Sequence, residues 1–351
     1  METRFAGLGQ TRAVIVALLL VMALVGAAWS VRGALGPKLR SDVTAQSDPD
    51  LYRSVVAGVE NGGDYYPVTA QALRKGHYPL RPFVTFRLPT LAWISAVLGS
   101  GALHLLQLAL GGAVMLAWGL RWRGTLAPIE LVAALVLLGA GLIGLVQPAA
   151  ALFHESWAAM LLALAIAHDR KGRAALAIVA GTAALLIREL SLPLILALAG
   201  LSVVEHRRRE AFGWAAAVAL FAVVLILHAG AVSAVVLPTD LHSPGWSGLL
   251  GPGFAVRSLA QTSAATVLPP VPVALLLTLA LFGLASLRTG WALRASLMVV
   301  GYLAMVALFA RADTFYWAMM AAPLSLVGLA FVPRAARDLA AALRPVAVTG
   351  A

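Results

Sequence analysis

Residues 13–30 read AVIVALLLVMALVGAAWS and contain no charged side chain. A helix of this length is long enough to cross the hydrocarbon core of a bilayer. Arg4 and Arg12 precede the run, as basic residues precede a secretory signal. Because many further apolar runs follow, we expect a retained signal anchor rather than a cleaved signal peptide.

The rest of the chain has the same apolar character. Of its 351 residues, 61% are hydrophobic and only 12% are charged, and the mean hydropathy is +0.90. A soluble globular domain carries about twice that share of charged residues. The sequence therefore predicts an all-α integral membrane protein with about ten transmembrane helices. We expect residues 1–351 to form a single membrane domain without a soluble domain.

The basic residues predict the topology. The formal net charge is +11, but Lys and Arg lie in short clusters between apolar runs, which is typical of cytoplasmic loops and does not favour nucleic acid as a partner. With about ten spans, every short basic cluster falls on one side and both termini are cytoplasmic. Two long extracytoplasmic loops follow from this count, one at 31–101 with interfacial helices and one at 229–270.

A short apolar piece lies at the end of the first loop. We interpret Leu88 to Leu98 as a helix at the outer interface, ended by Gly99. The second span then covers roughly Ala102 to Leu120. The alternative is that Leu88 to Leu98 begins a bent span.

Acidic residues are concentrated in the first loop. The chain has 15 Asp and Glu in total, yet Asp48, Asp50, Glu60 and Asp64 lie close together there. Asp48 precedes Pro49, so its carboxylate can cap a helix that carries Asp50 in its first turn. A structural and a catalytic role are both open for Asp48.

The other predicted outer turns also carry charges. His154 with Glu155 and Arg188 with Glu189 lie at span ends, where they form helix starts, ion pairs or ligand contacts. Arg311 lies in the turn before the last span. Metal binding by His154, Glu155 and nearby acids has no supporting ligand spacing. We interpret the tryptophans near this boundary as belt aromatics, although sugars also stack on such rings; they are Trp29, Trp157, Trp246 and Trp317.

The first loop resembles that of the GT-C superfamily of polytopic glycosyltransferases, in particular the aminoarabinose and mannosyl transferase type. The matching motifs are Asp48 with Tyr52 four residues later, the turn Gly63-Asp64-Tyr65, and Arg87-Leu88-Pro89-Thr90. The resemblance covers roughly residues 10 to 120. Pro49 replaces the acid that usually follows the first Asp, and Arg81-Pro82 replaces a Lys-Pro-Pro sequence.

The resemblance implies a sugar transferase of the bacterial inner membrane, with its site facing the periplasm. The donor would be a polyprenyl-phosphate sugar, the acceptor a glycan, lipid or protein, and the mechanism inverting. Asp48 would be the general base, with Asp50 and Asp64 left open as alternatives. No cofactor is implied, and a divalent metal is not indicated. The expected phosphate and substrate ligands are Arg188, Glu189, Arg311, Arg87, Arg81, Tyr52, Tyr65, Tyr66, His154 and Glu155, with Arg74 as a further cation.

Two other classes of function stay open at this point. A transporter or lipid flippase should carry ionisable groups near the middle of its spans, where this chain has almost none. A non-catalytic subunit of an envelope-assembly complex would use the loops as docking surfaces. Loss of chemistry on replacing Asp48, with folding retained, would separate the transferase from both.

Overall fold

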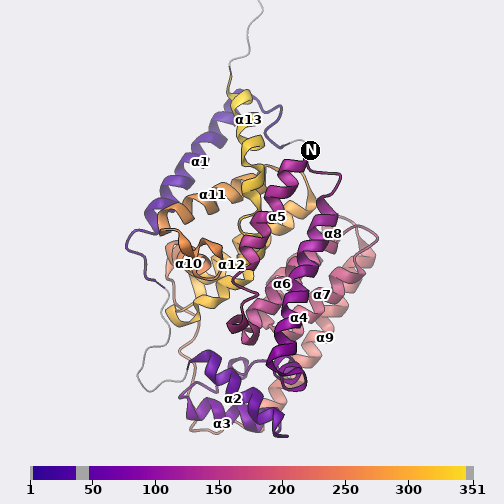
Figure 1. Ribbon diagram of the computed structural model, residues 1–351, viewed down its shortest axis with the longest axis vertical. Helices are drawn as coiled ribbons and strands as arrows, with labels where there is room; N and C mark the ends of the chain where they lie inside the picture. The colour runs from indigo at the N-terminus through magenta and orange to yellow at the C-terminus, as the bar shows by residue number, and fades with distance from the viewer. Residues whose placement is uncertain (1–2, 37–46, 345–351) are drawn as a thin grey trace, which may run out of the picture.

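The computed structural model describes residues 3–36 and 47–344 (Figure 1). Over these residues every regular element is a helix, and the only β pairing is two isolated bridges. This confirms the predicted all-α fold class. Part of the predicted first loop, residues 37–46, lies outside the described residues.

Five helical stretches of the described chain are long and apolar enough to cross a membrane. They are α1 (Gln10–Ser30), η1 (Phe83–Thr85) with α4 (Thr90–Trp122), α9 (Arg208–Ser233), α12 (Gly290–Phe309), and η5 (Ala312–Leu324), η6 (Val327–Phe331) and α13 (Val332–Leu343) together. These stretches indicate a membrane-embedded protein.

Shorter apolar helices complete the bundle. They are α5 (Pro128–Leu142), α7 (Ala175–Ile187), η3 (Glu189–Ser191) with α8 (Leu192–Val204), and α11 (Pro270–Ser286). The total of about ten spans stays a prediction.

Several helices connect the same two ends of the molecule. At the first end lie α2 (Asp48–Glu60) and α3 (Tyr65–Lys75), at the foot of Figure 1. The central helix α6 (His154–His168) begins near α2, is buried along most of its length, and ends at Asp169. Its 15 residues separate the two ends by about 22 Å. We call these ends the α2 end and the Asp169 end.

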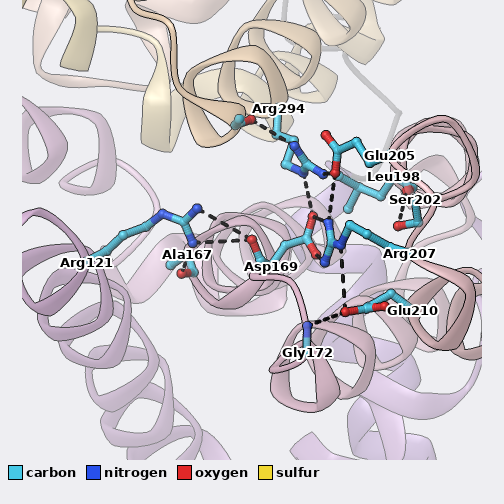
Figure 2. A network of polar contacts seen from close by, with 11 residues as sticks. Arg121, Ala167, Asp169, Gly172, Leu198, Ser202, Glu205, Arg207, Glu210 and Arg294 are labelled. Atoms are coloured by element: carbon cyan, nitrogen blue, oxygen red, sulfur yellow. Dashed lines mark hydrogen bonds and ion pairs between the residues drawn. The ribbon is translucent and has the colours of Figure 1, made fainter. Parts of the chain in front are cut away.

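An ionic network holds the Asp169 end together (Figure 2). The buried carboxylate of Asp169 accepts hydrogen bonds from Arg207, which precedes α9, and from Arg294 of α12. Glu205 accepts from both arginines, at 3.2 and 2.6 Å. Glu210 accepts from the Gly172 backbone and pairs with Arg207 at 3.7 Å. The network thus joins the loop after α6 to the α8–α9 connection and to α12.

Both described ends of the chain lie near each other. The Thr3 hydroxyl donates to Asp338 of α13 at 2.6 Å, and the Arg4 side chain donates to the Leu287 carbonyl just before α12. Helix α1 and α13 lie side by side at the top of Figure 1. The chain therefore returns to the end from which it started.

Helix α4 consists of two helical segments that meet at a kink, and the first of them agrees with the helix predicted at residues 88–98. The first segment begins at Thr90 and ends at Gly99, and the second continues from there to Trp122. The helix bends at Gly99, whose φ of 73° and ψ of 166° are not helical. The predicted end of a helix at Gly99 is therefore confirmed, and the position of this helix at the outer interface stays a prediction.

The predicted loop at 229–270 is corrected. Helix α9 continues to Ser233, and the interval contains α10 (Gly251–Gln261) and η4 (Ala264–Val267). Pro252 lies in the first turn of α10, where a proline ring is compatible with a helix. Phe254 and Leu259 are buried against the bundle, so much of this interval is core rather than an exposed loop.

The last predicted span is irregular. Residues 312–331 form mainly 3₁₀ turns, and most of their side chains are buried inside the protein. Helix α5 approaches this segment closely, since a Cβ added to Gly141 would lie 2.3 Å from the Ala322 carbonyl oxygen. Close backbone contact of this kind requires a residue without a side chain.

Candidate functional site

A cavity of about 610 Å³ opens between α2, α3 and the ends of the bundle helices. Four separate parts of the chain line it, at residues 48–95, 152–190, 241–246 and 311–317. Of the predicted site residues, the structure brings together Asp48, Tyr52, Tyr65, Arg87, His154, Arg188, Glu189 and Arg311. The others, Asp50, Asp64, Arg81, Tyr66 and Glu155, do not line it.

Asp48 is the first residue of α2, and its predicted capping role is wrong. The Ser47 hydroxyl caps this helix instead, accepting from the Asp50 backbone N–H at 3.4 Å. One Asp48 oxygen, Oδ1, accepts a hydrogen bond of 2.7 Å from the Tyr78 hydroxyl. Its other oxygen, Oδ2, has no hydrogen-bond partner among the described residues. A carboxylate at the cavity wall therefore keeps one oxygen for a ligand.

The other two candidate bases have local structural roles. Asp50 forms an exposed ion pair of 2.5 Å with Arg53, one turn later on α2. Asp64 caps α3, where its carboxylate accepts from the Tyr66 backbone N–H at 3.1 Å. Each of these carboxylates therefore binds a group of its own helix and does not line the cavity.

A charged cluster forms the inner wall of the cavity. Arg188 follows α7 and is only 1% exposed; its guanidinium lies 2.7 Å from Glu155 of α6 and also bonds Glu189. Arg87 pairs with Glu189 at 3.6 Å. Two cations thus meet two carboxylates, and Arg188 is the more completely neutralised of the two cations.

Arg87 and Arg311 are the more accessible cations. The Arg87 side chain is 18% exposed and reaches the Tyr316 hydroxyl at 3.5 Å. Arg311 is 30% exposed and forms a two-pronged pair with Asp313 at 3.1 Å, with a further bond to the Gly245 carbonyl. The ion pair of Arg87 is therefore longer than those of the other two cavity arginines, Arg188 and Arg311.

Arg74 of α3 and Arg81, which follows α3, bind the chain segment after α9 and do not line the cavity. Arg74 donates two hydrogen bonds to Asp240, at 2.8 and 2.7 Å, and these bonds lower the pKa of Asp240 to about 2. Arg81 donates to the backbone carbonyls of Pro238 and Asp240. Both arginines hold the segment 237–243 over the cavity.

Aromatic side chains shape the cavity near Asp48. The Tyr52 ring, one turn after Asp48 on α2, lies edge-on to His154 at 5.4 Å, and burial raises the pKa of the Tyr52 phenol. The Tyr65 hydroxyl donates to the Arg87 carbonyl at 2.7 Å. Tyr66 instead contacts His228 at 3.2 Å, outside the cavity wall.

The sequence analysis missed some lining residues. Tyr78 holds Asp48, Tyr316 contacts Arg87, and Trp246 packs edge-on against Trp317 at 6.2 Å. We expected the two tryptophans to be belt aromatics, but both line the cavity. No spacing in the sequence links these positions to Asp48, because they lie in different turns of the fold.

No group of three or more His, Asp or Glu side chains in the described part of the chain is arranged to hold a metal ion. Comparison of the sequence and the fold with protein-family models, curated proteins and solved structures finds no significant match for this chain. Evidence for a function therefore comes from the geometry of the cavity.

Proposed function

We propose that this protein is a membrane glycosyltransferase of the GT-C type, which moves one sugar from a polyprenyl phosphate to a hydroxyl of a glycan, lipid or protein. The observation that carries the proposal is the position of Asp48. It is the only acid of the 48–64 cluster that lines the cavity, and Arg87 and Arg188 line the same cavity.

In the proposed reaction, Asp48 is the general base. Its carboxylate takes the proton of the acceptor hydroxyl while that oxygen attacks the anomeric carbon of the donor. The bond from this carbon to the phosphate oxygen breaks, and the polyprenyl phosphate leaves with the bonding electrons. A positioned base of this kind accelerates a reaction about 100- to 10,000-fold. Inversion at the anomeric carbon follows from a single displacement.

The leaving phosphate needs positive charge. Arg87 supplies it in our proposal, because its contacts are long and its side chain is partly exposed. Charge-assisted hydrogen bonds to phosphate are among the stronger ones in proteins. Arg188 then has a supporting role, since it orients Glu189, the partner of Arg87.

The position of the cavity suits a lipid-linked donor. It lies at one end of the bundle, where a carrier tail can stay in the bilayer while its phosphate enters the protein. The basic clusters around Arg121, Arg207 and Arg294 lie at the Asp169 end. By the positive-inside rule we place that end and both termini in the cytoplasm, and the cavity at the periplasmic face of a bacterial inner membrane.

The test is sugar transfer by the purified full-length protein in lipid, using a panel of polyprenyl-phosphate sugars. We expect turnover by the natural protein and a loss of about 100-fold or more in Asp48→Asn. Asp50→Asn and Asp64→Asn are the matched controls and should keep most of the activity. Transfer that survives in a folded Asp48→Asn protein, or is absent from all four proteins, would overturn the proposal.

A further inference from the structure

A second hollow lies on the outside of the bundle, away from the α2 end. It has a volume of about 390 Å³ and lies between α4, α6 and α7. Its wall is apolar except for His168, and it includes Leu116, Leu120, Leu176 and Val179. These four side chains are between 59% and 65% exposed. An exposed apolar groove on a membrane protein is covered by hydrocarbon.

The groove ends at a basic loop. On α4, Leu120 is followed by Arg121 and Arg123; on α6, His168 is followed within a few residues by Arg170 and Lys171. Helix α7 begins after Arg173 and contributes Leu176. All three helices therefore bring positive charge to the same end of the groove.

Most of these cations have no acidic partner. Arg121 is turned toward the protein, where it donates to the Ala167 carbonyl at 2.6 Å (Figure 2). The other cations are the exposed Arg123, Arg170, Lys171 and Arg173. Within residues 3–36 and 47–344, none of them forms an ion pair with an acidic side chain.

The acids nearest in sequence are already engaged. Asp169 is held by Arg207 and Arg294, and Glu210 is held by the Gly172 backbone and Arg207. The basic loop at 170–173 therefore presents uncompensated positive charge beside an apolar groove. A small soluble anion would bind the positive charge but leave the apolar groove empty. A neutral lipid would fill the groove but would not bind the positive charge.

We propose that this groove binds an anionic phospholipid, with one acyl chain between α4, α6 and α7 and the phosphate at the 170–173 loop. On α4 the groove extends from Ala113 to Leu120, about 10 Å, which accommodates part of an acyl chain. Basic pockets between membrane helices bind the head groups of anionic lipids in this way. The site lies at the Asp169 end and is separate from the proposed sugar-transfer cavity.

Native mass spectrometry of the full-length protein tests this proposal. The protein is delipidated in detergent and supplied with phosphatidylglycerol or with phosphatidylcholine. We expect selective retention of phosphatidylglycerol. Arg170→Gln/Lys171→Gln should weaken this retention about 25-fold, because each cation near an anionic head group strengthens binding about fivefold. Ala113→Phe, which fills the groove from an exposed position, should also reduce retention.

Matched variants separate a site from general attraction. Arg288→Gln/Arg337→Gln removes the same charge from exposed positions away from the groove, and Ala216→Phe adds the same ring to an exposed position of α9. Both should retain phosphatidylglycerol as the natural protein does. Equal loss in the two charge variants, or equal retention of the two lipids, would overturn the proposal. Retention unaffected by Ala113→Phe would overturn the placement of the acyl chain.

Discussion

Arg87 is the residue on which donor binding should depend most. Its ion pair of 3.6 Å with Glu189 and its 3.5 Å contact with the Tyr316 hydroxyl are both long, so a phosphate can replace them at small cost. We predict that Arg87→Gln weakens binding of a polyprenyl-phosphate sugar about ten- to hundredfold, the usual value of a hydrogen bond to a charged group. The Kd of the purified protein measures this effect.

Arg188→Gln, at the same cavity wall, should differ from Arg87→Gln in its effect on stability. Arg188 is buried against Glu155, so the variant leaves a carboxylate without its partner and should lose about 3–5 kcal/mol of stability. Arg87→Gln should keep the Tm of the natural protein. A natural-like Kd in Arg87→Gln would contradict our assignment of the phosphate to Arg87.

Single residues also mark the limit of the sequence analysis. The acidic cluster was visible in the sequence, and the resemblance favoured Asp48 but left Asp50 and Asp64 open as alternatives. Their roles depend on the start of α2, which Ser47 sets, and on Tyr78, which lies 30 positions from Asp48. Which carboxylate faces a cavity is a property of packing, and the order of residues alone does not determine it.

At the scale of one element, Gly99 determines the shape of α4. Its φ of 73° and ψ of 166° belong to a region that glycine alone adopts readily. We predict that Gly99→Ala lowers the stability by about 1–3 kcal/mol, measured as thermal unfolding in detergent by circular dichroism.

Gly101→Ala is the matched control on the same helix. Its backbone is helical, and an added Cβ meets no atom within 4 Å. Alanine there should stabilise the helix by about 0.5–1 kcal/mol, because it loses less backbone freedom on folding than glycine. The same destabilisation in both variants would show that the bend at Gly99 is not the cause.

Helices were predicted well where an apolar run stood alone, as for α1, which was expected at residues 13–30. They were predicted poorly where packing decided the conformation. The apolar composition of residues 312–331 predicts one more membrane span. Close packing against α5 and α6 instead gives this segment 3₁₀ turns. A loop was expected at 229–270, whereas the buried Phe254 and Leu259 stabilise α10 within it.

At the scale of the whole molecule, Asp169 joins three parts of the chain that are distant in sequence, namely the loop after α6, the α8–α9 connection and α12. Asp169→Asn should cost about 3–5 kcal/mol, because the charge that compensates the buried Arg207 and Arg294 is reduced. The Tm of the purified protein measures the loss. Asp50→Asn breaks an exposed pair and should change stability by less than about 1 kcal/mol. Equal effects would contradict a structural role for the network.

The outer turns were predicted as a group, and the cavity does collect several of them. The basic clusters in alternate turns made this prediction possible, because they assign each turn to one end of the bundle. The partners within that end could not be predicted. Arg74 and Arg81 were expected to bind phosphate, yet they bind the 237–243 segment, which no periodicity in the sequence connects to α3.

The four-part wall of the cavity also has a consequence for biosynthesis. Asp48 and Arg87 emerge from the ribosome early, but Tyr316 and Trp317 follow only after most of the apolar helices have been made. A nascent chain that stops before Ala312 lacks one side of the cavity. Assembly of the site therefore coincides with completion of the bundle, and insertion intermediates in the membrane carry only an unfinished site.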